Sequence, residues 1–148
     1  MIEIRPGTRH DLPQILKLIV ELAVFEKEPN AVKTTVESMA EDGFGENPVF
    51  GFLVAADGDK IVGMSLFYDR YSTWRGRCLY LEDLIVTESY RGQGIGKMLL
   101  DRTIEKAKTE GYRGMSWQVL EWNEPAINFY KKYNTQFDGK WVNCMIDH

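Results

Sequence analysis

The sequence predicts a mixed α/β fold in which a mostly antiparallel twisted sheet is flanked by helices. Apolar residues alternate with polar ones in some stretches and recur at helical spacing in others, which indicates both kinds of element. The second half also contains a strand–helix–strand arrangement, the usual connection between parallel strands. The predicted order of elements is β, α, α, β, β, β, α, β, α, β.

The first third of the chain contains one predicted strand and two predicted helices. Residues 2–4 alternate in polarity, and Thr8 with Asp11 forms a variant capping box before a helix. The apolar residues of this helix recur at helical spacing: Leu12, Ile15, Leu16, Ile19, Leu22 and Ala23. A second helix is predicted over residues 35–42 and is expected to end at Gly43, because glycine suits the left-handed position after a helix.

Three apolar, β-rich runs follow and predict a central antiparallel meander. They cover residues 50–56, 61–68 and 78–86. The first two are joined by Asp57-Gly58-Asp59-Lys60, which is a strong hairpin signal.

The remaining elements are two helices and two strands. A helix follows the glycine-rich residues 92–96 and is expected to end at Gly111. Its predicted buried side consists of Ile95, Met98, Leu99, Ile104 and Ala107. A strand is predicted over residues 115–120, a helix from near Asn123, and a last strand over residues 141–146.

Composition limits the classes of function that this chain can have. Its 148 residues, 44% of them hydrophobic and 27% charged, predict one soluble domain over residues 1–148. The net charge of -4 argues against nucleic acid as a partner. The absence of a signal-like N-terminus and of any long apolar stretch predicts a cytoplasmic protein with no membrane partner. Cys78 and Cys144 are too isolated for a disulfide framework, and no ligand spacing indicates a metal site.

The residues Arg91-Gly92-Gln93-Gly94-Ile95-Gly96 form a candidate anion site between a buried strand and a helix. Glycines let backbone amides approach a ligand, and the free amides and positive end of the helix favour phosphate. The nucleotide-triphosphate loop does not fit, because Gly96-Lys97 is followed by Met98. The dinucleotide fingerprint does not fit either, because the third glycine comes one residue early. The alternative is a glycine-rich turn that only connects strand and helix.

With its preceding strand, this turn resembles the pyrophosphate-binding signature of the GCN5-related N-acetyltransferase (GNAT) superfamily, Q/R-x-x-G-x-G/A. Within that superfamily the chain is most similar to the diamine acetyltransferases, the spermidine/spermine and thialysine N-acetyltransferase group. Further likenesses are Glu41-Asp42-Gly43-Phe44-Gly45, Leu79-Tyr80-Leu81-Glu82-Asp83 and Glu121-Trp122-Asn123-Glu124-Pro125. The resemblance spans nearly the whole chain.

The resemblance implies that acetyl-CoA is the cosubstrate, that the acceptor is a small primary amine, and that the protein is a homodimer. The backbone of residues 84–86 is expected to meet the pantetheine arm and the developing oxyanion. The residues implied in cosubstrate binding are Leu84, Ile85, Val86, Arg91, Gly92, Gln93, Gly94, Ile95, Gly96, Lys97, Asn123 and Tyr130.

Two adjacent carboxylates, Glu82 and Asp83, interrupt an otherwise apolar strand. Burying an unpaired carboxylate is costly, so at least one of them should meet a cation or water in a cleft, to which a β-bulge would direct it. An amine with a pKa of about 10.4 must lose a proton before it attacks a thioester, and Glu82 is the first candidate for the base. The alternative is that both acids are edge carboxylates bonded to Arg75 or Arg77.

The family resemblance implies that Glu26, Glu82 and Asp83 line the amine site. Aromatic faces also bind cations, which makes Trp74 a candidate substrate contact, with core or interface packing as the alternative. The chain has Ser72 where polyamine-specific relatives commonly have an acid. This departure favours a shorter amine, such as a lysine-like amino acid.

Tyr130 and Asn123 belong to the last predicted helix. The departing thiolate needs a proton, and the resemblance implies that Tyr130 is the general acid that supplies it. Asn123 precedes Glu124-Pro125, which is a good arrangement for an N-cap, and the resemblance adds contact with the coenzyme. Two alternative functions remain open: acetylation of a protein N-terminus or lysine, and a non-catalytic module that only binds acetyl-CoA.

Overall fold

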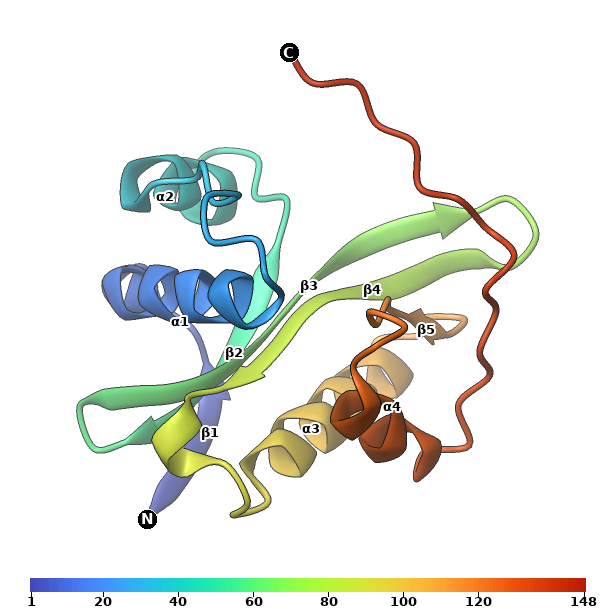
Figure 1. The fold of residues 1–148 in the computed structure, drawn as a ribbon. Coiled ribbons are helices and arrows are strands. Elements are labelled where there is room, and N and C mark those ends of the chain that lie inside the picture. The colour runs from blue at the N-terminus through green and yellow to red at the C-terminus, as the bar shows by residue number, and fades with distance from the viewer. The chain divides into compact units, whose positions relative to one another are not determined.

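A computed structural model describes residues 1–148, which form two units, Met1–Gln118 and Val119–His148. The first unit contains all the strands and the first three α-helices (Figure 1). In chain order these are β1 Ile2–Pro6, α1 Leu12–Phe25, α2 Val36–Phe44, β2 Gly51–Asp57, β3 Lys60–Ser72, β4 Gly76–Val86, α3 Ile95–Thr109 and β5 Met115–Ser116. The second unit contains α4, Glu124–Lys131.

The strands form one sheet in the order β1-β2-β3-β4-β5, which is also their order in the chain. The first four are antiparallel neighbours, and β5 lies parallel to β4 after the α3 crossover. The predicted meander and crossover are therefore confirmed. The hairpin of β3 and β4 extends past the other strands, because β3 pairs with β2 only as far as Phe67 (Figure 1).

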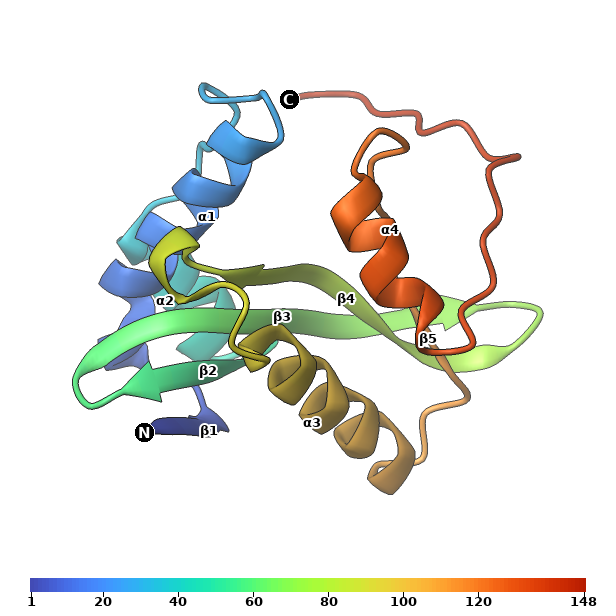
Figure 2. The same cartoon turned by 60° about the horizontal axis from the view of Figure 1, so that its bottom comes forward.

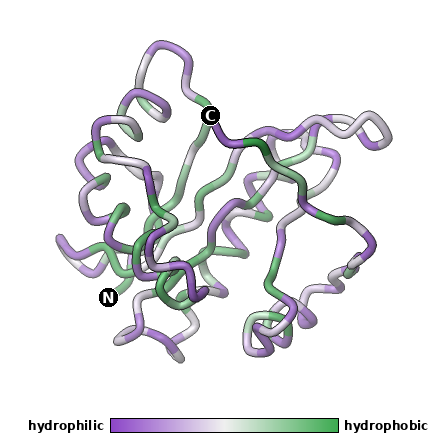
Figure 3. The backbone as a smooth tube through the Cα atoms, turned by 45° about the horizontal axis from the view of Figure 1, so that its top comes forward, coloured by the Kyte–Doolittle hydropathy of each residue, from purple (hydrophilic) through white to green (hydrophobic).

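Helices cover both faces of this sheet. α1 and α2 lie on one face, called the α1 face below, and α3 lies on the other, called the α3 face (Figure 2). Neighbouring residues of β2 enter different cores: Val54 packs under α1 and Ala55 packs under α3. A strand buried on both sides needs a continuous apolar run, and hydrophobic stretches accordingly follow the central strands in Figure 3.

The predicted capping pattern is present at a short 3-10 helix, Arg9–Asp11, that leads directly into α1. The carboxylate of Asp11 accepts hydrogen bonds from the amide of Thr8 at 2.8 Å and from the guanidinium of Arg5 at 2.8 Å. These contacts satisfy a buried carboxylate, and they lower its pKa, with the Arg5 hydrogen bond as the largest cause.

The predicted end of the second helix is wrong. α2 continues through Gly43 and ends at Phe44, with Gly45 as an extended C-cap. Gly43 has a packing role instead, because a Cβ there would lie 2.6 Å from the ring of Phe50. The prediction that Met98 lies on the buried side of the next helix, α3, is also wrong, because Met98 is 39% exposed. Leu100, which was not predicted to be buried, is fully buried.

Two strand predictions in the second half need correction. β5 is confined to Met115–Ser116, because only these residues pair with β4. Residues 141–146 form no strand, since a ladder needs a partner and none pairs with them. Trp141 and Val142 are instead 74% and 84% exposed. No helix of the structure is both long and apolar enough to cross a lipid bilayer.

Candidate active site

Glu82 lies at a β-bulge in β4. Asp83 pairs with Leu66 of β3 and Leu81 pairs with Phe67, so Glu82 is an extra residue with no partner across the ladder. A bulge bends the strand and redirects a side chain, and Glu82 is exposed. The bulge thus explains how two adjacent carboxylates fit into an apolar strand.

Asp83 and Glu26 join Glu82 in one group, called the acid cluster below. Asp83 lies on the α1 face, because its partner Leu66 belongs to the core under α1. Burial, followed by the charges of Glu82 and Glu26, raises the pKa of Asp83 to about 7. Burial, followed by the charge of Glu82, also raises the pKa of Glu26. Three carboxylates that repel one another in this way favour a bound cation.

The end of α1 positions Glu26. The amide of Lys27 donates to the carbonyl of Val24 at 3.1 Å, and the amide of Glu28 donates to the carbonyl of Ala23 at 2.9 Å. These two bonds form a Schellman motif, in which Lys27 takes the left-handed position with a φ of 66°. The chain therefore turns away from the helix directly after Glu26.

Two tyrosines lie on the α1 face of the β3–β4 hairpin, next to the acid cluster. Tyr68 and Tyr80 face each other across the ladder with ring centroids 5.3 Å apart. The Tyr68 hydroxyl donates to Oε1 of Glu82 at 3.0 Å. Burial and the adjacent Glu82 raise the pKa of Tyr68 to about 12, so its phenol is a donor at neutral pH. Arg77 pairs with Asp69 instead, which argues against the arginine-paired alternative for Glu82.

The glycine turn has the geometry that an anion site requires. Gly92 and Gly94 both have a φ of 79°, and a Cβ at either position would meet nothing within 4 Å. The first hydrogen bond of α3 runs from the amide of Met98 to the carbonyl of Gly94 at 3.1 Å. The amides of Ile95 and Gly96 therefore lack partners within the helix and are available to phosphate. These residues fit the pyrophosphate of acetyl-CoA.

Arg91 is held in place before this turn by three contacts. Its Nε donates to the carbonyl of Val86 at 2.9 Å, and its Nη2 donates to Oε2 of Glu21 at 3.4 Å. Its guanidinium also lies 5.5 Å from the ring centroid of Phe25. Both Glu21 and Phe25 belong to α1, so this helix supports the arginine.

Glu21 is a site residue that the sequence did not reveal. Its carboxylate also accepts hydrogen bonds from the Thr87 hydroxyl at 2.7 Å and from the Glu88 amide at 3.0 Å. These three residues and Ser89 line an open hollow of about 590 Å³. The partners lie 66 and 67 residues along the chain, so no local signal could have identified them.

The backbone between the acid cluster and the glycine turn has an open edge. β5 pairs with β4 only through Leu79–Met115 and Tyr80–Ser116. Beyond these pairs, β4 continues to Val86 without a strand partner on that side within residues 1–118. The backbone of residues 84–86 lies along this unpaired part of β4.

The other predicted residues of the first unit lie on the surface. Gln93 is exposed, and Lys97 pairs with Asp101 at 2.6 Å. Trp74 is 88% exposed at the tip of the β3–β4 hairpin. It lies six residues beyond Tyr68, roughly 20 Å along the strand, so it is remote from the acid cluster of its own chain.

The second unit contains the other two predicted residues. Asn123 is the N-cap of α4, and its Oδ1 accepts a hydrogen bond from the amide of Ala126 at 3.3 Å. The predicted capping role is therefore confirmed. Tyr130 lies in the last turn of α4, where its carbonyl accepts a hydrogen bond from the Thr135 hydroxyl at 2.6 Å.

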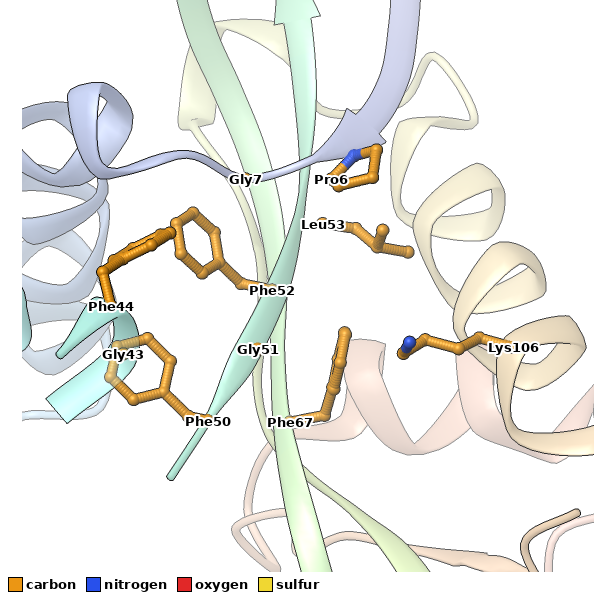
Figure 4. Close-up of a pocket in the computed structure, with 10 residues that line it drawn as sticks. All are labelled: Pro6, Gly7, Gly43, Phe44, Phe50, Gly51, Phe52, Leu53, Phe67 and Lys106. Atoms are coloured by element: carbon orange, nitrogen blue, oxygen red, sulfur yellow. The ribbon is translucent and has the colours of Figure 1, made fainter. Parts of the chain in front are cut away.

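A separate hollow of about 230 Å³ opens at the edge of the sheet where β1 ends (Figure 4). Phe44, Phe50 and Phe52 line it on one side of β2, and Phe67 and Lys106 line it on the other. It contains no carboxylate, so it lacks the charge that binds an amine. No group of three or more His, Cys, Asp or Glu side chains is arranged to hold a metal ion.

Comparison with known proteins identifies sequence relatives and folds of the same kind. The family described as "Acetyltransferase (GNAT) family" matches residues 15–134. The chain is 43% identical over 141 residues to the thialysine N-epsilon-acetyltransferase of Mus musculus, and the aligned region covers 90% of this chain and 83% of the relative. It is 39% identical over 135 residues to the spermidine/spermine N(1)-acetyltransferase-like protein 1 of Homo sapiens, and the aligned region covers 86% of this chain and 19% of the relative.

Among solved structures, an aminoglycoside acetyltransferase from an uncultured soil metagenomic sample has a similar fold. The TM-score is 0.80 at 22% sequence identity, with 99% of this chain and 96% of that chain covered. At this identity the likeness concerns the fold alone.

Proposed function

The chain belongs to the GNAT family of acetyl-CoA-dependent N-acetyltransferases, and on this premise we propose that it acetylates a primary amine of a small molecule. The acceptor class is a diamine, a polyamine or a lysine-like amino acid, and the transfer is direct. The observation that carries this proposal is the acid cluster at one end of the open edge of β4, with the glycine turn beyond its other end. The acids suit an ammonium group and the turn suits phosphates.

The cosubstrate half of the site is assigned to the turn and the open strand edge. Arg91 and the amides of residues 92–97 hold the pyrophosphate, and the backbone of residues 84–86 meets the pantetheine arm. Acetyl-CoA supplies the activated acetyl group when it is bound. By family resemblance, Asn123 and Tyr130 of the second unit also contact it.

The amine half of the site has to bind an ammonium group and then remove its proton. Glu26 and Asp83 hold the ammonium form, and Glu82 accepts the proton directly or through water. Asp83 is a second candidate for the base, because a pKa of about 7 lies near the operating pH. Tyr130 supplies a proton to the departing thiolate, as its family position implies.

The proposal extends to the organisation of the protein. Residues 1–148 are proposed to act as one catalytic domain, in a cytoplasmic homodimer that needs no metal, nucleic acid or membrane. Light scattering coupled to size-exclusion chromatography measures the dimer directly. The exposed Trp74 belongs to the substrate site only if a second copy brings an acid cluster near it.

The reaction is tested by thiol release from acetyl-CoA with a panel of acceptors. The panel contains thialysine, lysine, short diamines, spermidine and a lysine peptide, each read against a blank without acceptor. Release with a free small amine is the expected result. Release with the peptide alone would replace the proposal by protein acetylation, and binding of acetyl-CoA without any release would replace it by a non-catalytic module.

A further inference from the structure

Arg70 lies on the same surface as the tyrosines of the amine site. It follows Tyr68 by two residues on β3, in a part of the ladder with regular pairing, so both side chains are on the α1 face. Its guanidinium lies 5.6 Å from the ring centroid of Tyr80. The surface therefore runs from the acid cluster across two aromatic rings to an arginine.

Arg70 forms no ion pair, unlike two other arginines near the site. Arg77 pairs with Asp69 and Arg91 pairs with Glu21, whereas Arg70 only stacks on Tyr80. The side chain is exposed, and its guanidinium carries a fixed fork of N–H donors that matches a carboxylate. Its charge also reaches the tyrosines, since it opposes the larger effect of burial that raises the pKa of Tyr80.

We propose that Arg70 binds the carboxylate of the acceptor while the acid cluster binds its ammonium group. The acceptor class is then an α-amino acid with a primary amine at the end of its side chain. This inference rests on the proposed function, because it assumes that the amine reacts at the acid cluster. It adds a residue and a second subsite to that function.

The spacing of the backbone positions that carry the two subsites is comparable with the length of such a molecule. The rung of Arg70 and the bulge at Glu82 are separated by three to four residues along the hairpin, about 10–13 Å. The charged ends of an extended lysine-sized amino acid lie about 7 Å apart at bond lengths of about 1.5 Å. With a charge-assisted hydrogen bond of about 2.8 Å at each end, it spans about 12 Å.

The same arrangement disfavours a diamine. A diamine that placed one ammonium in the acid cluster would bring its second ammonium toward the guanidinium of Arg70. An α-amino acid also brings an ammonium group there, but its carboxylate is attracted and offsets the repulsion, whereas a diamine has only the repelled charge. The surface is therefore bipolar, and Arg70 is the residue that distinguishes the two acceptor classes.

A substrate pair of equal chain length tests this assignment. L-lysine and 1,5-diaminopentane have the same amine arm and differ by the carboxylate. Both are offered to the enzyme in one reaction with acetyl-CoA, and the two acetylated products are measured by mass spectrometry, which gives the ratio of their kcat/KM values. The enzymes are the wild type, Arg70→Gln and the matched control Arg102→Gln, which removes an exposed charge from α3 on the other face.

The expected result is that Arg70→Gln lowers the lysine-to-diamine ratio of kcat/KM about tenfold, which corresponds to the loss of one charge-assisted hydrogen bond. Arg102→Gln should leave the ratio unchanged. An unchanged ratio in Arg70→Gln, which equal losses with both acceptors would also give, would overturn the carboxylate subsite and leave the acetyltransferase proposal standing. Failure of the wild type to acetylate any amine of the acceptor panel would instead overturn the proposed function itself.

Discussion

At the scale of single residues, Asp83 combines a proposed role in the site with a cost to folding. An aspartate in an unfolded chain has a pKa of about 3.9, whereas in the folded protein the pKa of Asp83 is about 7. Between these pH values the folded protein binds one more proton than the unfolded chain, so this group lowers stability as the pH rises from about 4 to 7. The cause is burial next to two other acids.

Asp83→Asn should therefore stabilise the protein by an amount that depends on pH. The expected gain over the wild type is on the order of 2 kcal/mol at pH 8 and close to zero at pH 4. Urea denaturation at both pH values measures it, with Glu105→Gln on the exposed side of α3 as the control. A gain of equal size at both pH values would show that Asp83 is not destabilised by its charge.

Tyr130→Phe removes one hydroxyl and tests the assigned proton donor. The expected result is a kcat at least tenfold lower with little change in the KM for acetyl-CoA, because the proton is needed only as the thiolate departs. Initial rates with both substrates varied give these constants. Unchanged turnover at saturating substrate would remove Tyr130 from the mechanism.

At the scale of elements, α1 supports both halves of the site. Glu21 contacts the turn before α3, and Glu26 belongs to the acid cluster at the end of the same helix. Since Arg91 rests against Glu21 and Phe25, the orientation of the arginine depends on α1. If Arg91 and the turn bind the cosubstrate as proposed, Glu21 is a positioning residue, because it contacts these groups directly.

Glu21→Gln should raise the KM for acetyl-CoA about fivefold and leave the KM for the amine unchanged. The amide keeps the size of the side chain but loses the charge that holds the guanidinium and the Glu88 amide. Two-substrate kinetics separate the constants, with Glu105→Gln as the control. If only thermal stability falls and both KM values persist, Glu21 has a structural role alone.

The elements that the sequence predicted well are those with a strong local pattern. Most boundaries of the helices and of the meander follow from apolar periodicity, and the glycine turn follows from its motif. Elements decided by distant contacts were missed or misplaced. Gly43 lies inside α2, where the nearby ring of Phe50 leaves no room for a side chain, so this glycine has a packing role and does not end the helix. Residues 141–146 are mostly apolar, as a strand can be, but have no partner strand.

At the scale of the whole molecule, β4 connects the functional parts of the first unit. Its bulge carries Glu82, its open edge carries the backbone of residues 84–86, and its end leads to the glycine turn. The sequence predicted these parts because the two acids interrupt an apolar strand and the glycines follow it. It could not predict Glu21 or Arg70, whose importance depends on side chains brought together by folding.

In the proposed function, the acid cluster binds and deprotonates the amine, while the glycine turn binds the cosubstrate. The most direct test is the steady-state kinetics of Glu82→Gln with both substrates varied. We expect that kcat/KM for the amine falls at least tenfold while the KM for acetyl-CoA stays within about twofold of the wild type. An unchanged kcat/KM for the amine together with a raised KM for acetyl-CoA would contradict it.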